Sequence, residues 1–384
     1  MSSTKTIVAS TTLAVGGLFL FYKSLPTIIT AILKLQMNPL DENLGSLVQE
    51  KGAPSYDEIK ALGIVEGKSA LVVGGTRGAG FGAALALAKS GASTVTVVGR
   101  SEESGSKAVA KIVDELDSDS KSSINFLQGD IGTVASAKEL LEKLEASDTR
   151  YDYLILTAAI FPKSKRKNPT PLNSEGIEKS FAIGALGRLF LFRGAHTFMK
   201  KPAEDPSHSP MILNVMAAGT NLGMPFDRDL VQSLHGFHLF NIGNFAVGNE
   251  ILLHKLTTRQ DGSKGGQNSD GTPFAIPIIT THPGFLKTDL HRGQGFLMDI
   301  AEAVSMHFMG STEEVCGKRE VSLLCAVGEK YIENKASLLT IVDNFGYGRF
   351  MNNDIKRDVK EHGDWLWDLL VFMEGGGSID KFEG

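Results

Sequence analysis

The chain has 384 residues, a formal net charge of −5 at pH 7, and ordinary apolar and charged fractions of 42% and 22%. These values exclude wholesale disorder, and the acidic balance gives no reason to expect a nucleic-acid partner. The two cysteines, Cys316 and Cys325, cannot build a disulfide framework and match no zinc spacing. We therefore predict no metal site and a reducing, cytosol-facing domain.

Residues 1–35 form a predicted hydrophobic membrane anchor. The run Ile7–Tyr22 carries no charge, and a second apolar stretch, Leu25–Leu35, follows almost at once. A bilayer span needs about 20 apolar residues, so the favoured interpretation is a single anchor or a shallow hairpin through residues 7–35. Two alternatives stay open: a cleaved signal peptide, although no A-x-A-like site follows, and a helix packed on the domain's own surface. Attachment to an endomembrane or a lipid droplet is the expected location.

After a predicted linker over residues 36–66, strand and helix patterns alternate from residue 67 to residue 348. The strand candidates are short β-rich runs: Ala70–Val73, Thr94–Val98, Ile124–Leu127, Tyr153–Leu156, Met211–Val215, Ile276–Thr280 and Leu338–Val342. The helical stretches between them include Phe81–Lys89, Glu103–Leu116, Val134–Leu144 and Glu175–Met199. Strands separated by helix-length segments predict an α/β fold, a doubly wound parallel sheet of the Rossmann type in a single domain.

Residues 349–384 form a predicted C-terminal helical tail. The segment His362–Glu374 is apolar around most of its circumference, which is typical of a buried helix. A core helix that covers the substrate side of the sheet is favoured over membrane insertion, because the run is too short to span a bilayer.

The first predicted strand is followed directly by the glycine-rich turn Val73–Gly82, and a helix then begins. A turn from strand to helix directs unpaired backbone N–H groups and the positive end of the helix dipole at one point, which favours an anion. Glycines allow the backbone to approach a pyrophosphate closely. The turn therefore predicts a dinucleotide site.

The spacing Gly74-x-x-x-Gly78-x-Gly80 resembles the TGxxxGxG turn of the short-chain dehydrogenase/reductase family, with Val73 in place of threonine. The resemblance runs from about Gly67 to Gly348. Its further motifs are Gly99-Arg100, Gly129-Asp130-Ile131, Leu156-Thr157-Ala158-Ala159, Asn214-Val215 and His282-Pro283-Gly284-Phe285-Leu286-Lys287-Thr288. By this resemblance the cofactor-binding residues are Gly74, Thr76, Arg77, Gly78, Gly80, Arg100, Asp130, Ile131, Ala158, Asn244, Pro283, Gly284 and Thr288.

The end of the second strand favours NADP(H) over NAD(H). Enzymes that use NAD place an acidic residue there, whereas this chain has Gly99 followed by Arg100. A guanidinium pairs well with a phosphate dianion, and Arg77 in the glycine turn supplies a second positive charge. In NADP-preferring members of the family, basic residues occupy these two places.

The four residues that handle the proton in this family are missing. The serine position, just after Asn214-Val215, is Met216-Ala217-Ala218-Gly219, and the asparagine position is Gly184. Phe240 and Asn244 fall at the tyrosine and lysine positions. His235 and His238 precede or begin the same predicted helix and are the candidate substitute acids, because histidine titrates near neutrality.

Two functions stay open. The first is a membrane-attached, NADP(H)-dependent oxidoreductase for a small lipophilic carbonyl or alcohol. The second is a catalytically inactive NADP(H)-binding homologue that acts as a scaffold or sensor, since function depends on the site and not on the fold. The sequence leaves open the substrate, the direction of the reaction and whether the chain forms a homo-oligomer.

Overall fold

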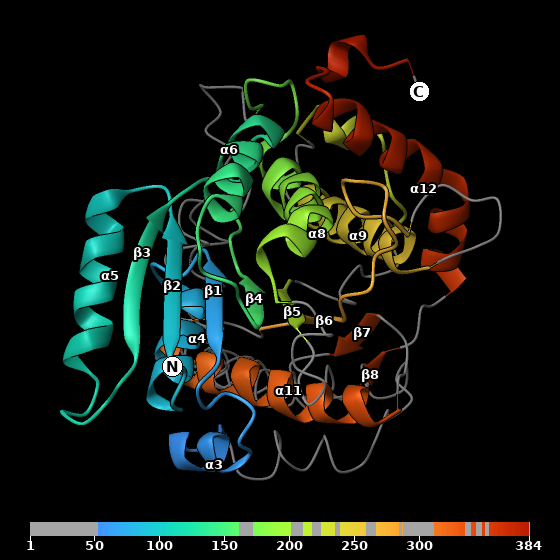
Figure 1. Ribbon diagram of the computed structural model, residues 1–384. Coiled ribbons are helices and arrows are strands. Elements are labelled where there is room, and N and C mark those ends of the chain that lie inside the picture. The colour runs from blue at the N-terminus through green and yellow to red at the C-terminus, as the bar shows by residue number, and fades with distance from the viewer. Residues whose placement is uncertain are drawn as a thin grey trace, which may run out of the picture.

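The computed structural model describes residues 53–160, 172–200, 210–216, 224–234, 239–258, 266–283, 286, 311–334, 339–342, 348–349 and 353–383. These residues form a central sheet with helices on both faces (Figure 1). The predicted membrane segment, residues 7–35, lies outside the described residues. Within the described residues, no helix combines the length and apolar character that crossing a bilayer requires.

The sheet has eight strands in the order β3-β2-β1-β4-β5-β6-β7-β8. Neighbouring strands from β3 through β7 pair in parallel, and only β8 pairs antiparallel. The strand bounds are β1 Ser69–Val73, β2 Thr94–Gly99, β3 Ser123–Gln128, β4 Tyr153–Leu156, β5 Met211–Val215, β6 Ile278–Thr281, β7 Leu339–Val342 and β8 Gly348–Arg349. The predicted doubly wound parallel sheet is confirmed, with β8 as an added edge.

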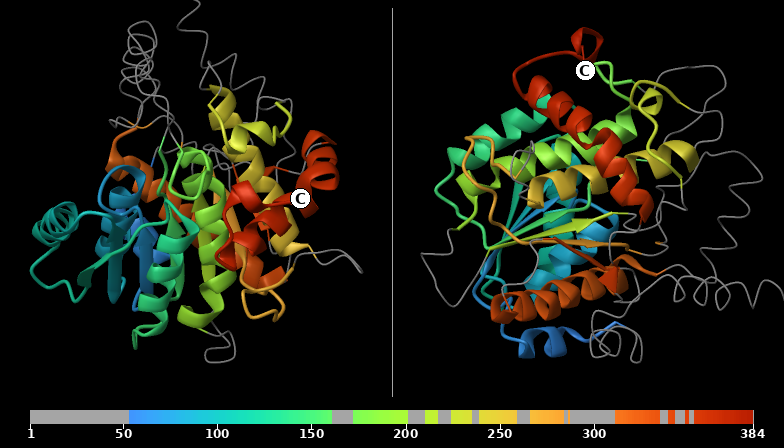
Figure 2. Two further views of the ribbon diagram at one scale, coloured as in Figure 1. Left: turned by 90° about the horizontal axis from the view of Figure 1, so that it is seen from above. Right: turned by 90° about the vertical axis from the view of Figure 1, so that its right-hand side faces the viewer.

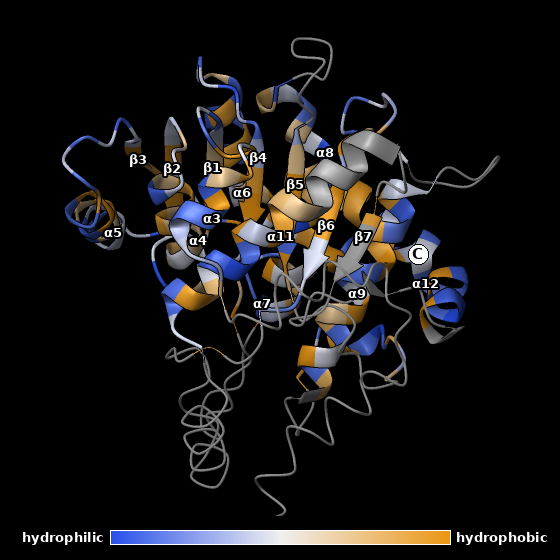
Figure 3. Cartoon of the chain, turned by 90° about the horizontal axis from the view of Figure 1, so that it is seen from below, coloured by the Kyte–Doolittle hydropathy of each residue, from blue (hydrophilic) through white to orange (hydrophobic). Residues whose placement is uncertain are grey.

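Buried β-rich sequences explain why the central strands lie in the middle of the molecule. Every residue of β1, β4 and β5 is buried, and Figure 3 shows β4 and β5 in hydrophobic colours between the helices. Val73 pairs with both Val98 and Leu156, so the carboxyl ends of β1, β2 and β4 align. In an open parallel sheet this edge is where ligands bind.

One face of the sheet is covered by α3, α4, α5 and α11, whose apolar side chains form one core (Figure 2). Their bounds are α3 Tyr56–Ala61, α4 Gly78–Lys89, α5 Glu102–Asp114 and α11 Glu313–Asn334. Ile59 and Val65 are fully buried in this core, so this part of the predicted 36–66 linker packs on the domain.

The other face is covered by α6, α8, α9 and α12. Their bounds are α6 Val134–Glu145, α8 Gly187–Phe198, α9 Leu239–Thr257 and α12 Asn353–Glu374. A short α7, Lys179–Phe181, and a π-helical turn, Ala182–Leu186, lead into α8.

The C-terminal helix α12 is part of the core. Its apolar face is buried at Leu366, Trp367, Leu369, Leu370 and Met373. The helix is also held by an ion pair between Glu374 and Arg193 of α8, whose side chains are 14% and 7% exposed. The sequence predicts a buried helix here, and the structure shows that α12 packs on α9.

Candidate functional site

The glycine turn lies at the carboxyl ends of β1, β2 and β4. Gly74 and Gly78 have positive φ angles of 90° and 63°, which glycine adopts at no steric cost. A Cβ on Gly74 would lie 2.5 Å from the backbone nitrogen of Ala158, and one on Gly80 would collide with Gly74 and Thr157. The packing of the turn on the end of β4 therefore requires these glycines. From the sequence alone, they are explained only by the close approach of a pyrophosphate.

The turn ends where α4 begins. Arg77 is the N-cap residue, and its side chain makes no capping hydrogen bond. The first N–H groups of a helix have no acceptor within the helix and attract an anion. In this structure the first of them, Gly78 N–H, donates to the carboxylate of Glu313 at 2.6 Å. Strand, turn and helix terminus thus lie together where the sequence predicts an anion site, and the two close-packed glycines fix the backbone there.

Arg77 and Arg100 are exposed at this edge of the sheet. Within the described part of the chain, neither guanidinium has a hydrogen-bond or ion-pair partner. Next to Arg100 in the chain, a Cβ on Gly99 would lie 2.5 Å from Cγ2 of Thr76, the residue before Arg77. An acidic side chain at position 99 would collide with the turn, so the acidic residue of NAD-binding proteins is sterically excluded here. Two positive charges lie at the same strand end, where the adenosine ribose of a dinucleotide is expected.

The predicted adenine and nicotinamide contacts follow other strands at the same edge. Asp130, after β3, accepts hydrogen bonds on Oδ1 from the backbone N–H groups of Ile131 and Gly132, at 2.8 and 3.1 Å. Ile131 is buried. Pro283 follows β6, and its carbonyl lies 3.8 Å from Cys316 Sγ. Gly284, Thr288 and the candidate acids His235 and His238 lie outside the described residues.

The family's tyrosine and lysine positions carry no proton chemistry. Phe240 has a phenyl ring, 41% exposed, in place of a phenol. Asn244 is buried and uses both ends of its amide on the backbone of Asp227: its Oδ1 accepts from Asp227 N at 2.7 Å, and its Nδ2 donates to Asp227 O at 3.0 Å. Asn244 therefore holds the segment Phe226–Arg228 in place.

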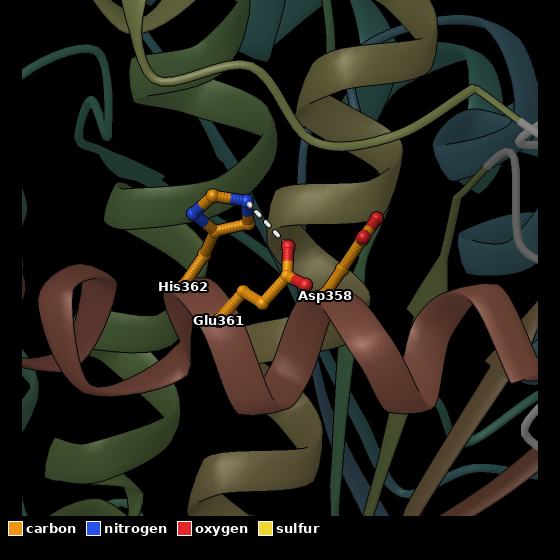
Figure 4. Close-up of side chains that lie close together, drawn as sticks. All are labelled: Asp358, Glu361 and His362. Carbon is orange, nitrogen blue, oxygen red and sulfur yellow. Dashed lines mark ion pairs between the residues drawn. The ribbon is translucent and has the colours of Figure 1, made fainter.

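The same segment is held from its other side by α12. Asp358, Glu361 and His362 project from one face of this helix (Figure 4), and their potential ligand atoms lie within 4.8 Å of one another. Asp358 Oδ2 accepts from Phe226 N at 3.0 Å, and Arg228 Nε lies 3.2 Å from His362 Nδ1. Asp358 and His362 thus hold Phe226 and Arg228 in place, and the positive charge of Arg228 beside the cluster disfavours a cation.

A buried polar network lies beneath the serine and asparagine positions. Arg188 of α8 is fully buried and donates to Asn214 Oδ1 at 2.6 Å, Val215 O at 2.8 Å and Ala158 O at 2.8 Å. Asn214 Nδ2 donates to Asn249 Oδ1, and Asn249 donates to the carbonyl of Gly184, both at 3.0 Å. Burial lowers the pKa of Arg188 to about 9, so the group is still charged at neutral pH.

Sequence reasoning did not identify this network. Arg188 lies inside an apolar helical stretch, and nothing local shows that it reaches the ends of both β4 and β5. The network ties together the strand ends from which Ala158 and Met216 emerge. It therefore fixes the ends of β4 and β5 relative to each other.

Comparison with known proteins identifies the domain. A family model described as short chain dehydrogenase matches residues 68–226. Similar curated proteins include human polyprenol dehydrogenase, 27% identical over 164 residues (43% of this chain, 46% of that protein). An uncharacterised oxidoreductase of Saccharomyces cerevisiae is 31% identical over 223 residues (57% and 61%). A Neurospora crassa protein named as a mitochondrial oxidoreductase is 24% identical over 249 residues (64% and 58%).

The chain thus spans between 46% and 61% of the length of these relatives. Among solved structures, the MalC reductase/Diels-Alderase of Malbranchea aurantiaca superposes with a TM-score of 0.50 and 18% identity, covering 74% of this chain and 96% of that one. At this identity the likeness shows the fold alone. Family model, strand order and glycine turn agree, and residues 68–226 match the short-chain dehydrogenase/reductase family.

Proposed function

We propose that this protein is an NADP(H)-dependent oxidoreductase that acts on a lipophilic carbonyl or alcohol and is attached to a membrane through residues 7–35. The observation that carries the cofactor choice is the edge formed by Arg77, Gly99 and Arg100. Two exposed guanidiniums, which have no partner among the described residues, favour a 2′-phosphate. Steric contact with Thr76 disfavours the acidic side chain that NAD enzymes use.

The chemistry divides between cofactor and protein. When bound, NADPH supplies the hydride for carbonyl reduction. The chain's residues hold the pyrophosphate at the start of α4 and the phosphate at Arg77 and Arg100. His235 or His238 would deliver the proton to the developing alkoxide. A general acid contributes roughly 10²- to 10⁴-fold to a rate, so a reactive carbonyl could still turn over slowly without one.

The substrate class follows from the apolar N-terminal run and from one relative. A protein held at a bilayer by residues 7–35 meets membrane-dissolved substrates at high local concentration. Human polyprenol dehydrogenase, a relative by sequence, is named for a lipid alcohol. Both considerations favour a long-chain lipophilic substrate.

A second candidate function is a catalytically inactive NADP(H)-binding scaffold or sensor. The observation that favours it is the state of Asn244, whose amide is fully engaged with Asp227 and cannot activate a proton donor. Phe240 and Met216 also lack any group that could polarise a carbonyl. The NADP(H) site is common to both candidates.

The cofactor choice is tested by binding. We expect full-length protein in detergent to bind NADPH more tightly than NADH in a fluorescence titration. Arg100→Ala should weaken NADPH binding by roughly 10- to 100-fold and leave NADH binding unchanged, because a charge-assisted phosphate contact is lost. Arg150→Ala, which precedes β4 at the opposite edge of the sheet, is the matched control. An unchanged NADPH/NADH ratio in Arg100→Ala would disprove the assignment.

Turnover separates the two candidates. NADPH oxidation is followed with long-chain aldehydes, quinones, diketones and retinoid-like carbonyls in mixed micelles. Consumption of NADPH with any of them supports the oxidoreductase, and loss of that rate in His238→Ala or His235→Ala identifies the acid. Tight NADPH binding without turnover on the whole panel supports the scaffold or sensor.

A further inference from the structure

A carboxylate of the chain itself occupies the start of α4. Glu313, the first residue of α11, accepts a hydrogen bond on Oε1 from the backbone N–H of Gly78 at 2.6 Å. Gly78 is the first residue of α4 and one of the N–H groups that the helix leaves without an acceptor. The side chain of Arg77 does not cap this helix, so the anionic cap comes from a residue 235 positions away in the chain.

The backbone of Glu313 is fixed on α4. A Cβ on Gly82 would collide with the carbonyl of Glu313, and a Cβ on Gly317 would collide with the backbone of Gly82. The first turn of α11 therefore packs backbone to backbone on the first turn of α4. This contact prevents a small shift of α11 away from α4. The carboxylate of Glu313 can therefore leave Gly78 only by rotation of its side chain.

The charge of Glu313 is not neutralised by a neighbour. Within the described residues, Gly78 N–H is the partner of this carboxylate, and no lysine or arginine pairs with it. The adjacent Glu314 differs, since it binds Tyr56 OH at 3.0 Å and Lys318 Nζ at 3.1 Å on the side of α3. Two neighbouring acidic residues thus have separate tasks.

We infer that Glu313 is a built-in competitor of the dinucleotide pyrophosphate, and that it sets the affinity of the cofactor site. The inference rests on the proposed NADP(H) function. A pyrophosphate and the Glu313 carboxylate are both anions directed at the same helix terminus. Binding of the dinucleotide therefore requires Glu313 to give up its bond to Gly78 and to remain near a like charge. The cofactor is bound more weakly, and released more readily, than the glycine turn alone would allow.

The test is NADPH binding to full-length protein, the Glu313→Gln variant and the matched control Glu314→Gln. Loss of one nearby like charge should tighten NADPH binding roughly 5- to 20-fold in Glu313→Gln. Glu314→Gln makes the same change of charge one residue away and should stay within about twofold, because it leaves Gly78 untouched. Glu313→Ala removes the acceptor as well as the charge and should tighten binding in the same direction.

A second readout is thermal unfolding. Without cofactor, Glu313→Gln should unfold at a lower temperature than wild type, since the cap on α4 is weakened. With saturating NADPH, its gain in unfolding temperature should exceed that of wild type. The unfolding transition also shows whether Glu313→Gln is folded. If Glu313→Gln does not fold, Glu313→Ala is used in both experiments.

The outcomes are distinguishable. Wild-type binding of NADPH with no tightening in either Glu313 variant would overturn the inference and leave the proposed function intact. Absence of NADPH binding in all variants would overturn both. NADPH binding by Glu313→Gln that wild type lacks would support both and would show a site closed by its own carboxylate.

Discussion

Arg188 is buried at the centre of the molecule, where a charge is costly. Its side chain is 0% exposed, and this burial lowers its pKa. Its hydrogen bonds go to oxygen atoms at the ends of β4 and β5. A buried cation without a carboxylate persists only if such dipoles replace its hydration.

We predict that Arg188→Lys destabilises the fold by about 2–4 kcal/mol. Lysine keeps the charge in the same apolar site, but its single ammonium cannot reach acceptors on two strands at once. Urea unfolding measures the loss. Arg150→Lys is the control, because Arg150 bonds to nearby carbonyls of Ser147 and Thr149 at the surface and should change stability by less than about 0.5 kcal/mol. Equal effects of the two substitutions would argue against the network.

At the residue scale, local pattern predicted the glycines and the two arginines but not their partners. Gly74, Gly80 and Arg100 stand in fixed spacings beside a strand end, so their surroundings follow from the motif. Glu313 and Arg188 carry no such spacing. Their contacts join segments far apart in the sequence, and a side-chain contact of that kind depends on packing that no local pattern encodes.

At the element scale, α4 and α11 pack closely against each other on one face of the sheet. Gly82 and Gly317 face each other with no room for a methyl group between the backbones. This contact brings Glu313 to Gly78 and fixes the start of α4 against the sheet. Glycine is required at positions 82 and 317 because the two helix backbones approach closely, and not because of a positive φ angle.

We expect Gly317→Ala to destabilise the protein by roughly 2–4 kcal/mol, since a methyl group in this position forces the helices apart. Gly363→Ala is the matched control, as it also lies inside a helix, but its Cβ would meet side chains, Lys255 at 3.0 Å and Val359 at 3.7 Å, and no backbone of another helix. Alanine at position 363 should be neutral or slightly stabilising, because alanine favours helix by about 1 kcal/mol over glycine. Thermal or urea unfolding gives both values, and a tolerated Gly317→Ala would show that the helices can separate without cost.

Element prediction succeeded where the apolar pattern was continuous. All seven predicted strands occur within one or two residues of their bounds, because short β-rich runs between turn signals have few alternatives. The helix α12 begins at Asn353, nine residues before the predicted segment, since Asn353–Glu361 is polar and its helical order depends on packing against α9. The two-residue strand β8 has no pattern of its own and forms by pairing with β7.

At the scale of the whole molecule, the proposed cofactor site would combine segments from both halves of the chain. The glycine turn, Arg100 and Asp130 belong to the first half, whereas Asn244, Pro283 and Glu313 come from the second. The core on the α4 side is one continuous cluster of buried residues between Ile59 and Cys325. A substitution inside this core therefore affects the stability of the whole domain. Glu320 of α11 is such a position.

Glu320 is fully buried, and Thr281 Oγ1 donates to its Oε2 at 2.5 Å. Burial raises the pKa of Glu320 from 4.5 to about 7, against smaller opposing effects of the Thr281 hydrogen bond and Arg319. Between these two values the folded protein holds a proton that the unfolded chain has released. The stabilising contribution of this group is therefore complete below about pH 4.5 and is lost as the pH rises through about 7.

We predict that Glu320→Gln is close to wild type in stability at pH 5 and more stable by about 1–3 kcal/mol at pH 8. Glutamine keeps the shape of the protonated acid and its acceptor for Thr281, but it cannot ionise in the buried site. Urea unfolding at several pH values measures the difference between variant and wild type, which removes the contribution of every other titrating group. Glu139→Gln, exposed on α6, should show a flat difference over the same range. A flat difference for Glu320→Gln, or one that falls with rising pH, would mean that Glu320 is already ionised in the folded protein at pH 5.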